Sequence, residues 1–313
     1  MRLGLALPLA PKGRDAAGFV DELVDEVCAA DEAGFDVCLI PEHHNGPLAS
    51  LVAPLTLTAA LAAVTTRIRI GPGVLILPVH APLHVAEQIA MIDRISHGRA
   101  VLGVGMGYQQ EDFQPFGIDR AERVERFEIG LRAVAELLAD HGRTGLLTVR
   151  QPRPPIWVGA WSDSGVRRAA LTADGWIADP IRTITEVAAM AKRYRQARPE
   201  QPGTVVVMRE AWVEDDPMAA QHFSAVIEPV FSYYRRRRAA ALPLRFDDLA
   251  ADRFIIGSAA QCLHQVRECA ALTGADVVVL TLRHPGGPGH EDVLEAIRAL
   301  GSAALSATAR GET

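Results

Sequence analysis

Hydrophobic residues along this chain occur in short uninterrupted runs, separated by longer stretches in which they recur every three or four positions. Runs of this kind are too short for helices and lack the alternation of half-buried strands, so they predict strands buried on both faces. The expected strands are Leu3–Leu7, Val37–Ile40, Ile68–Leu77, Val101–Val104, Ile156–Val158, Trp176–Ala178, Val205–Met208 and Val277–Leu282.

The intervening stretches predict amphipathic helices, since their apolar positions repeat with the period of an α-helix. Between the first two strands, Val20, Leu23, Val27 and Ala30 share one helical face. Pro82 suits the first turn of the helix that precedes the fourth strand. Further helices are expected near Arg123–Leu138, Ser164–Thr172, Thr183–Ala197, Pro217–Phe231, Ala259–Leu272 and Glu291–Leu300.

Eight buried strands that alternate with helices are typical of an all-parallel sheet, and this number over 313 residues favours a (β/α)₈ TIM barrel over an open sheet. No Ser/Gly-rich linker divides the chain, so residues 1–313 are expected to form a single domain. Tyr233–Ala251 is the least regular stretch, and we interpret it as an insertion or lid before the last strand–helix unit.

Composition narrows the class of partner and the cellular compartment. A net charge of −6 argues against nucleic acid or an anionic membrane as the main partner. The basic run Arg235–Arg238 is typical of a solvated helix face. No apolar run reaches the ~20 residues of a membrane span. The cysteines (Cys28, Cys38, Cys262 and Cys269) form no Cys-x-x-Cys pair, which favours free thiols and a cytoplasmic location.

The residues that follow the strands carry the candidate chemistry, because parallel-barrel enzymes keep their active sites at this end. Glu42, His43 and His44 follow the second strand, and glycines are dense after the third, fourth and fifth strands. Glycine lets the backbone approach a flat or anionic ligand closely. Ser162 and Ser164 precede a helix, where a hydroxyl and free N–H groups could bind a phosphate, although Ser is also a plain helix cap.

A metal site at Glu42, His43 and His44 is disfavoured, because adjacent residues of an extended chain point to opposite sides. His80 and His84 are four residues apart, but Pro82 between them indicates that the helix begins too late to pair them. We therefore expect no metal.

In chain order, these motifs resemble the bacterial luciferase-like family of flavin-dependent monooxygenases, which also includes oxidoreductases that use the deazaflavin F420. The matching segments extend over nearly the whole chain. They are Ala33-Gly34-Phe35-Asp36, Pro41-Glu42-His43-His44, Gly71–Pro78, Ala86-Glu87-Gln88, Ile92–Arg99, Gly103–Gly107, Asp112–Gly117, Pro155–Gly159, Ala173–Trp176 and Ile256-Gly257-Ser258.

The resemblance implies a barrel fold and assigns roles to particular residues. His43 occupies the position of the catalytic histidine, with Glu42 and His44 as orienting neighbours. Gly73–Val74 would be a non-prolyl cis peptide beneath the flavin ring. The ring and ribityl chain would lie against Glu42, Gly105, Met106, Gly107 and Tyr108, and the phosphate against Gly159, Ala160, Trp161, Ser162, Gly165 and Val166.

Two departures from the family pattern affect the expected site. Met106 stands where luciferases place an arginine against the flavin phosphate, and Arg123, Arg167 or Arg168 could compensate. The segment His141–Pro154 is also shorter than the corresponding family loop, which would leave one wall of the substrate pocket more open.

The resemblance implies that reduced FMN and O₂ form a C4a-(hydro)peroxyflavin, which oxygenates a small organic substrate. The FMN would come from a separate NAD(P)H:flavin reductase, because no nicotinamide fingerprint is present. An F420-dependent hydride-transfer enzyme and a non-catalytic flavin-binding homologue are the alternatives, and an intact His43 argues against the latter. The substrate could be aromatic, given Tyr108, Trp161 and Trp212. Family barrels commonly pair, so a homodimer is expected.

Overall fold

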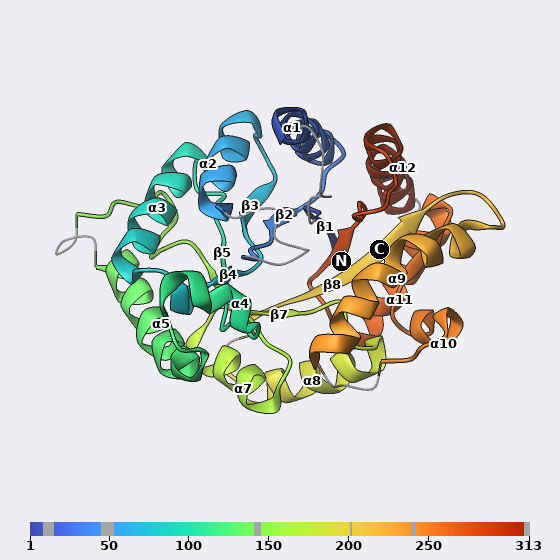
Figure 1. Cartoon of the computed structure of the whole chain (residues 1–313). Helices are drawn as coiled ribbons and strands as arrows, with labels where there is room; N and C mark the ends of the chain where they lie inside the picture. Colours follow the sequence, from blue (N-terminus) through green and yellow to red (C-terminus); the bar gives the residue numbers. More distant parts are fainter. Residues whose placement is uncertain (9–15, 45–52, 141–144, 201, 239–241, 310–313) are drawn as a thin grey trace.

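Parallel strands form the centre of the molecule, and helices surround them in a ring (Figure 1). The computed structural model describes residues 1–8, 16–44, 53–140, 145–200, 202–238 and 242–309. The strands are β1 (Arg2–Ala6), β2 (Val37–Ile40), β3 (Arg69–Pro72), β4 (Leu75–Ile76), β5 (Leu102–Gly105), β6 (Ile156–Gly159), β7 (Gly175–Ala178), β8 (Thr204–Val213), β9 (Ile255–Gly257) and β10 (Val277–Thr281).

The strands run around a nearly closed barrel in the order β3-β2-β1-β10-β8-β7-β6-β5-β4. β4 continues the course of β3, and a parallel bridge between Ile70 and Ala100 joins the two ends of the sheet. β9 pairs only with the outer end of β8. Each expected strand thus forms one side of the barrel, which confirms the (β/α)₈ prediction.

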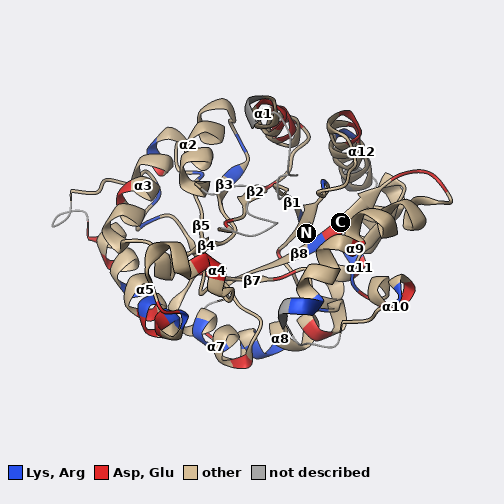
Figure 2. Cartoon of the chain, in the orientation of Figure 1, with Lys and Arg blue, Asp and Glu red and all other residues tan. Residues whose placement is uncertain are grey.

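The helices cover the outside of the barrel and carry most of the charged side chains, whereas the strands carry few (Figure 2). They are α1 (Ala16–Glu32), α2 (Pro54–Val64), α3 (Pro82–Ile95), α4 (Gln110–Phe113), α5 (Arg123–Ala139), α7 (Asp163–Thr172), α8 (Ile184–Gln196), α9 (Ala219–Arg238), α10 (Phe246–Ala250), α11 (Ala259–Thr273) and α12 (His290–Ala309). Three short 3₁₀ helices span Leu77–Val79, Gln114–Phe116 and Arg120–Glu122. No helix in the described ranges is long and apolar enough to cross a membrane.

Three segments differ from the sequence-based expectation. The run Ile68–Leu77 is divided into β3 and β4 around Gly73 and Val74. The helix expected over Pro217–Phe231 continues to Arg238, and residues 246–250 form α10, so the irregular stretch expected at Tyr233–Ala251 is largely helical. Residues 239–241 of that stretch, and residues 141–144 of the loop His141–Pro154, lie outside the described part of the chain.

Side chains fill the inside of the barrel and the end at which its strands begin. Val37, Leu39, Val206 and Val279 belong to a buried cluster that includes the fully buried Trp157. The guanidinium of Arg69 lies 5.1 Å from the centre of the Trp157 ring. A packed interior leaves the opposite end, where the strands terminate, as the place for a ligand.

Buried or partly buried carboxylates fix the loops that feed the strands. Asp31 accepts hydrogen bonds from the backbone N–H groups of Arg67 and Ile68, at 2.9 and 2.6 Å, just before β3. Asp174 likewise accepts a 2.7 Å hydrogen bond from the backbone N–H of Ile156 at the start of β6. These contacts satisfy backbone donors that the strands leave unpaired and hold the strands in register.

Candidate active site

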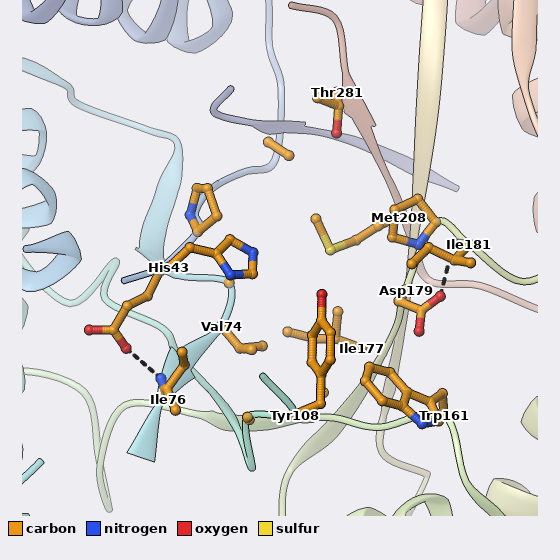
Figure 3. A pocket seen from close by; sticks show the side chains of 18 of the residues that line it. His43, Val74, Ile76, Tyr108, Trp161, Ile177, Asp179, Ile181, Met208 and Thr281 are labelled. Carbon is orange, nitrogen blue, oxygen red and sulfur yellow. Dashed lines mark hydrogen bonds between the residues drawn. The ribbon is translucent and has the colours of Figure 1, made fainter. Parts of the chain in front are cut away.

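A cavity of about 440 Å³ lies at the carboxyl ends of the strands. Figure 3 shows His43 at the left of the cavity, Met208 at the right and Thr281 at the top, with Tyr108 and Trp161 along the lower side. The cavity collects nearly all the residues expected to form the site. The expected residues that line it are Glu42, His43, Gly73, Val74, Gly105, Met106, Gly107, Tyr108, Arg123, Gly159, Ala160, Trp161, Ser162 and Gly165.

Two expected residues do not line this cavity. The ring of His44 lies on the other side of its strand end, 5.0 Å from the ring of Phe116. Val166 is buried within α7. Adjacent side chains of an extended segment point to opposite sides, which explains why His43 faces the cavity and His44 does not.

Glu42 is buried and makes three polar contacts. Its Oε2 accepts a 2.5 Å hydrogen bond from the backbone N–H of Ile76, and its Oε1 lies 2.8 Å from His80 Nε2 and 3.2 Å from His44 Nε2. Burial alone would raise the pKa of Glu42, but these contacts lower the pKa to about 2. Glu42 is therefore ionised at neutral pH and holds both imidazoles. Sequence reasoning missed the role of His80, because its partner is distant in the chain.

His43 faces the cavity as a neutral imidazole. Burial lowers its pKa to about 4, although the charge of Glu42 opposes this change. Among the described residues, no carboxylate forms an ion pair with the ring. The Nδ1 atom of His43 lies 3.2 Å from the amide Nε2 of Gln109 instead.

Gln109 was not among the expected site residues, yet its side chain links three groups of the site. Its Oε1 accepts a hydrogen bond from the hydroxyl of Tyr233 on α9, and its Nε2 lies 3.3 Å from the Tyr108 hydroxyl. The Tyr233 contact orients the amide so that its N–H group donates to His43 Nδ1. Because Nδ1 then accepts, the proton of the neutral ring resides on Nε2.

Asp112 forms a second carboxyl group near His44. Its Oδ1 accepts a 2.8 Å hydrogen bond from the backbone N–H of His44. Burial raises the pKa of Asp112 to about 6. Its Oδ2 is buried and has no hydrogen-bond partner among the described residues, and the residue lines the cavity.

The floor of the cavity centres on Val74, which follows a cis peptide bond at Gly73–Val74, as the family resemblance implied. The glycines around it make room for this side chain. A Cβ atom added to Gly105 would lie 2.5 Å from Val74 Cγ2, and one added to Gly159 would lie 2.9 Å from Val74 Cγ1. The absence of a side chain at Gly105 and Gly159 therefore leaves space for the side chain of Val74, and not only for a ligand.

One end of the cavity is suited to an anion. Ser162 caps α7 by accepting a 3.1 Å hydrogen bond from the backbone N–H of Gly165. Arg123 lines the cavity together with Ser162, whereas Arg168 lies outside it and is paired with Glu128 at 2.7 Å. Among the arginines proposed to compensate for Met106, Arg123 alone belongs to the lining, since Arg167 is not part of it.

The wall opposite His43 carries a polar group that sequence reasoning missed. Glu210 on β8 and Thr281 on β10 are direct neighbours in the sheet, and both line the cavity. His284, also in the lining, places Nδ1 3.5 Å from Glu210 Oε2. Burial raises the pKa of Glu210 to about 7 and lowers the pKa of His284 to about 4.

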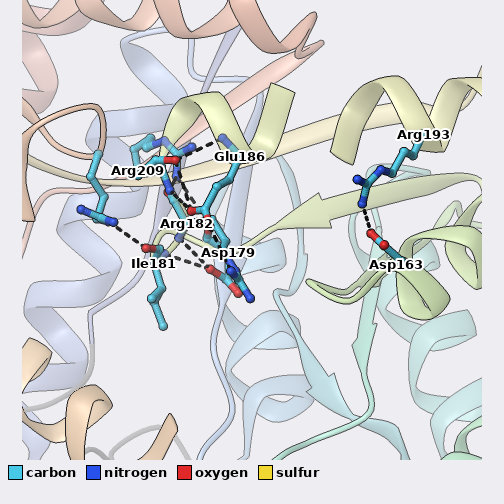
Figure 4. Close-up of polar contacts among 9 residues, drawn as sticks. Asp163, Asp179, Ile181, Arg182, Glu186, Arg193 and Arg209 are labelled. Carbon is cyan, nitrogen blue, oxygen red and sulfur yellow. Dashed lines mark hydrogen bonds and ion pairs between the residues drawn. The ribbon is translucent and has the colours of Figure 1, made fainter. Parts of the chain in front are cut away.

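The loop after β7 completes the lining and is held by buried arginines (Figure 4). Asp179 Oδ1 accepts a 2.9 Å hydrogen bond from the backbone N–H of Ile181. Arg209, on the outer face of β8, donates to the carbonyl oxygen of Arg182 at 3.2 Å, and Arg253 donates to that of Ile181 at 2.8 Å. The loop therefore has a fixed conformation beside the cavity.

A parallel barrel with a ligand-sized cavity at its strand ends defines an α/β-barrel enzyme scaffold. The model of the luciferase-like monooxygenase family matches residues 1–276. The chain therefore belongs to this family.

The sequences of related proteins match only part of this chain. The chain is 31% identical over 169 residues to the uncharacterized protein y4vJ of Sinorhizobium fredii, which covers 50% of this chain and 48% of that protein. It is 35% identical over 118 residues to limonene 1,2-monooxygenase of Rhodococcus erythropolis, which covers 38% of this chain and 30% of that enzyme. The match thus spans less than half the length of both relatives.

Solved structures share the fold over nearly the whole chain. Monooxygenase RslO1 from Streptomyces bottropensis superposes with a TM-score of 0.84 at 23% identity, covering 98% of this chain and 99% of that one. The oxygenating constituent of 3,6-diketocamphane monooxygenase from Pseudomonas putida, in complex with FMN, has a TM-score of 0.76 at 18% identity and 96% coverage of both chains. The F420-dependent tetrahydromethanopterin reductase of Methanopyrus kandleri has a TM-score of 0.68 at 17% identity, covering 97% and 98%.

Proposed function

We propose that this protein is a monooxygenase that uses reduced FMN and O₂ to oxygenate a small organic substrate. The observation that carries the proposal is the composition of one cavity, which combines the neutral imidazole of His43, the floor at Val74, and an anion-binding end at Ser162 and Arg123. Membership of the luciferase-like monooxygenase family supports it.

The residues present fit FMN. Val74 and the T-shaped pair of Tyr108 and Trp161, with ring centres 5.1 Å apart, offer apolar contacts to a flat ring system. Arg123 and the start of α7 provide positive charge and N–H groups for the phosphate. The unpartnered Oδ2 of Asp112 provides a polar atom for a bound group.

When bound, reduced FMN supplies the reaction with O₂ from which one oxygen atom passes to the substrate. The chain excludes water with the apolar lining and orients His43 through Gln109. His43 donates a hydrogen bond from Nε2, and an anionic group beside it would raise its pKa above the value of about 4, so that the ring can hold a proton. Glu42, next to His43, ties the end of β2 to the backbone N–H of Ile76 in β4.

The proposal implies further partners. A separate NAD(P)H:flavin reductase supplies reduced FMN, and two copies of the chain form a homodimer. We place the enzyme in the cytoplasm, because all four cysteines are free thiols and Cys38, Cys262 and Cys269 are buried.

An anaerobic titration of the purified protein with reduced FMN, and in parallel with reduced F420, tests the cofactor. We expect reduced FMN to bind at least tenfold more tightly. After air is admitted, we expect bound FMN to reoxidise more slowly than free FMN, because the cavity shields it from water. His43→Ala should retain FMN binding but lower turnover by ~10²-fold or more.

Two other results would point to different functions. Preferential binding of F420, with no faster consumption of O₂, would identify a hydride-transfer enzyme. Tight FMN binding with the same turnover in the wild type and in His43→Ala would remove His43 from the mechanism, and tight binding with the reoxidation rate of free FMN would indicate a flavin-binding protein without catalysis.

A further inference from the structure

The cavity wall across from His43 contains a group of polar residues, namely Glu210, Thr281 and His284. This group is separate from Glu42, from His43 and from the phosphate end of the cavity. Strand alternation directs Met208 and Glu210 inward from β8, while Arg209 between them points outward. Register places Thr281 of β10 beside Glu210. In Figure 3, Met208 and Thr281 mark this wall across the cavity from His43.

The orientation of His284 is fixed by its surroundings. Its Nε2 lies 3.1 Å from the carbonyl oxygen of Ala211, which can only accept, so the ring proton resides on Nε2. The ring packs against Phe223, with centres 5.1 Å apart. Backbone hydrogen bonds of 2.9 and 3.1 Å between His284 and Gly287 hold the turn that carries it. Its Nδ1 is therefore an acceptor directed at Glu210.

Glu210 is buried, and burial raises its pKa to about 7. Its carboxyl group is therefore mostly protonated and neutral below pH 7. The 3.5 Å between its Oε2 and His284 Nδ1 exceeds a normal O–H···N hydrogen bond, so His284 does not hold the carboxyl proton. The Thr281 hydroxyl donates to the carboxylate form. The protonated carboxyl group can thus donate to a ligand in the cavity.

Other charged groups lie around Glu210. Arg283, in the same lining, is paired with Glu22 and, at 2.5 Å, with Glu26. Arg209 donates to the backbone carbonyl oxygens of Met208 and Arg182, and its positive charge lowers the pKa of Glu210 less than burial raises it. Asp179 accepts hydrogen bonds from its own loop, and α9 contributes only Val230 and Tyr234 to the lining.

We propose that Glu210 is a substrate-binding residue whose carboxylic acid donates a hydrogen bond to the carbonyl oxygen of a neutral, largely hydrocarbon substrate. His284 and Thr281 position it, and Met208, Ile181 and Val230 contact the hydrocarbon part. A carbonyl group fits because it accepts and does not donate. A substrate carboxylate does not fit, because its negative charge would be buried beside the apolar side chains of Met208, Ile181 and Val230. This inference rests on the proposed function, because it names the class of substrate for that site.

The test compares two ligands of similar shape, 2-acetylnaphthalene and 2-isopropenylnaphthalene, in which a methylene group replaces the carbonyl oxygen. Equilibrium dialysis measures their binding to the full chain at pH 6 and pH 8.5, with and without saturating oxidised FMN. We expect the wild type to prefer the ketone about tenfold at pH 6, and to lose this preference at pH 8.5 as Glu210 ionises.

Three variants sharpen the test. Glu210→Gln keeps an N–H donor but cannot ionise, so the preference should persist at both pH values. Glu210→Leu should remove the preference at both. Glu268→Gln on the exposed face of α11 is the control for the loss of a carboxyl group and should match the wild type.

A ketone preference that survives in Glu210→Leu, or that does not change between pH 6 and 8.5 in the wild type, would overturn the inference. If Glu210→Leu fails to fold, the pH dependence of the wild type against Glu210→Gln still decides. Binding requires no turnover, so a Glu210-dependent preference without FMN binding would reject the proposed function alone. FMN binding without a ketone preference would reject this inference alone.

Discussion

At the scale of single residues, the state of His43 depends on the group that contacts its Nδ1 atom. The amide of Gln109 donates to this nitrogen, and a hydrogen bond to the unprotonated nitrogen favours the neutral ring. Burial acts in the same direction and lowers the pKa of His43 to about 4. The neutral ring therefore presents its Nε2–H group to the cavity.

Replacing Gln109 by Glu should reverse this effect. A carboxylate at the same position would accept a hydrogen bond from Nδ1–H and stabilise the charged imidazolium, so we expect the pKa of His43 to rise from about 4 toward neutrality. The pH dependence of the ring nitrogen chemical shifts of His43 measures this change. Gln114→Glu, at an exposed position of the same segment, is the control. An unchanged pKa in Gln109→Glu would show that Gln109 does not set the protonation of His43.

At the scale of elements, the strands could be predicted because each is apolar on both faces, and local patterns record such burial directly. The exceptions have physical reasons. The run at 68–77 was predicted as one strand from its apolar residues, and the structure divides it at Gly73 and Val74, where the resemblance implied a cis peptide bond. α2 was missed because Pro54–Val64 is apolar on nearly every side and shows no helical period.

The candidate site could be predicted where its residues form contiguous motifs at strand ends, as at Glu42 and His43 or Ser162 and Gly165. Glu210 and His284 stand singly in the sequence, and the register of β8 and β10 brings Glu210 to the cavity beside Thr281. Gln109 directly follows the predicted motif at Tyr108, but its partner Tyr233 lies far along the chain on α9. Their roles depend on contacts between distant segments, which a local pattern does not contain.

The two roles proposed for Ser162 can be separated by comparison with another helix cap. Ser162 caps α7, and Thr183 caps α8 in a capping box with Glu186. Replacing either by Ala should lower the free energy of unfolding by about 1 kcal/mol. Thr183→Ala should leave FMN binding unchanged, whereas Ser162→Ala should weaken FMN more than riboflavin, which lacks the phosphate.

Chemical denaturation and flavin titration of both variants provide these two measurements. Equal weakening of FMN and riboflavin by Ser162→Ala would place the phosphate elsewhere. A loss of stability without any change in FMN affinity would leave Ser162 as a helix cap only.

At the scale of the whole molecule, the cavity contains buried groups whose titrations oppose one another. His43 and His284 have pKa values lowered to about 4, so the folded state resists protonation and the stability that this gives is lost as pH falls below 6.5. Glu210 and Asp112 have pKa values raised to about 7 and about 6. Their burial destabilises the folded state at neutral pH, and protonation relieves this as pH falls.

The two effects nearly cancel between pH 7 and 5, so we expect the stability of the wild type to change little over this range. Below pH 4.5 the balance ends, because Glu42, with its pKa lowered to about 2, loses its contribution as it becomes protonated. Acid unfolding should therefore begin below pH 4.5, although His43 and His284 already bind protons above this value in the unfolded chain.

Replacing either Glu210 or His284 should reveal the effect of the remaining group on the free energy of unfolding. Between pH 7 and pH 5, Glu210→Gln should lose about 2 kcal/mol relative to the wild type, because its protonation no longer offsets that of the histidines. His284→Gln, which keeps an N–H donor for the carbonyl of Ala211, should gain about 2 kcal/mol over the same range. Urea denaturation at pH 7, 6 and 5 measures these slopes, with Glu268→Gln as the surface control. If the stability of both variants depended on pH as that of the wild type does, the stability of the fold would not be linked to Glu210 or His284. Opposite pH dependences in the two variants would show that the titrations of these buried groups offset each other in the wild type.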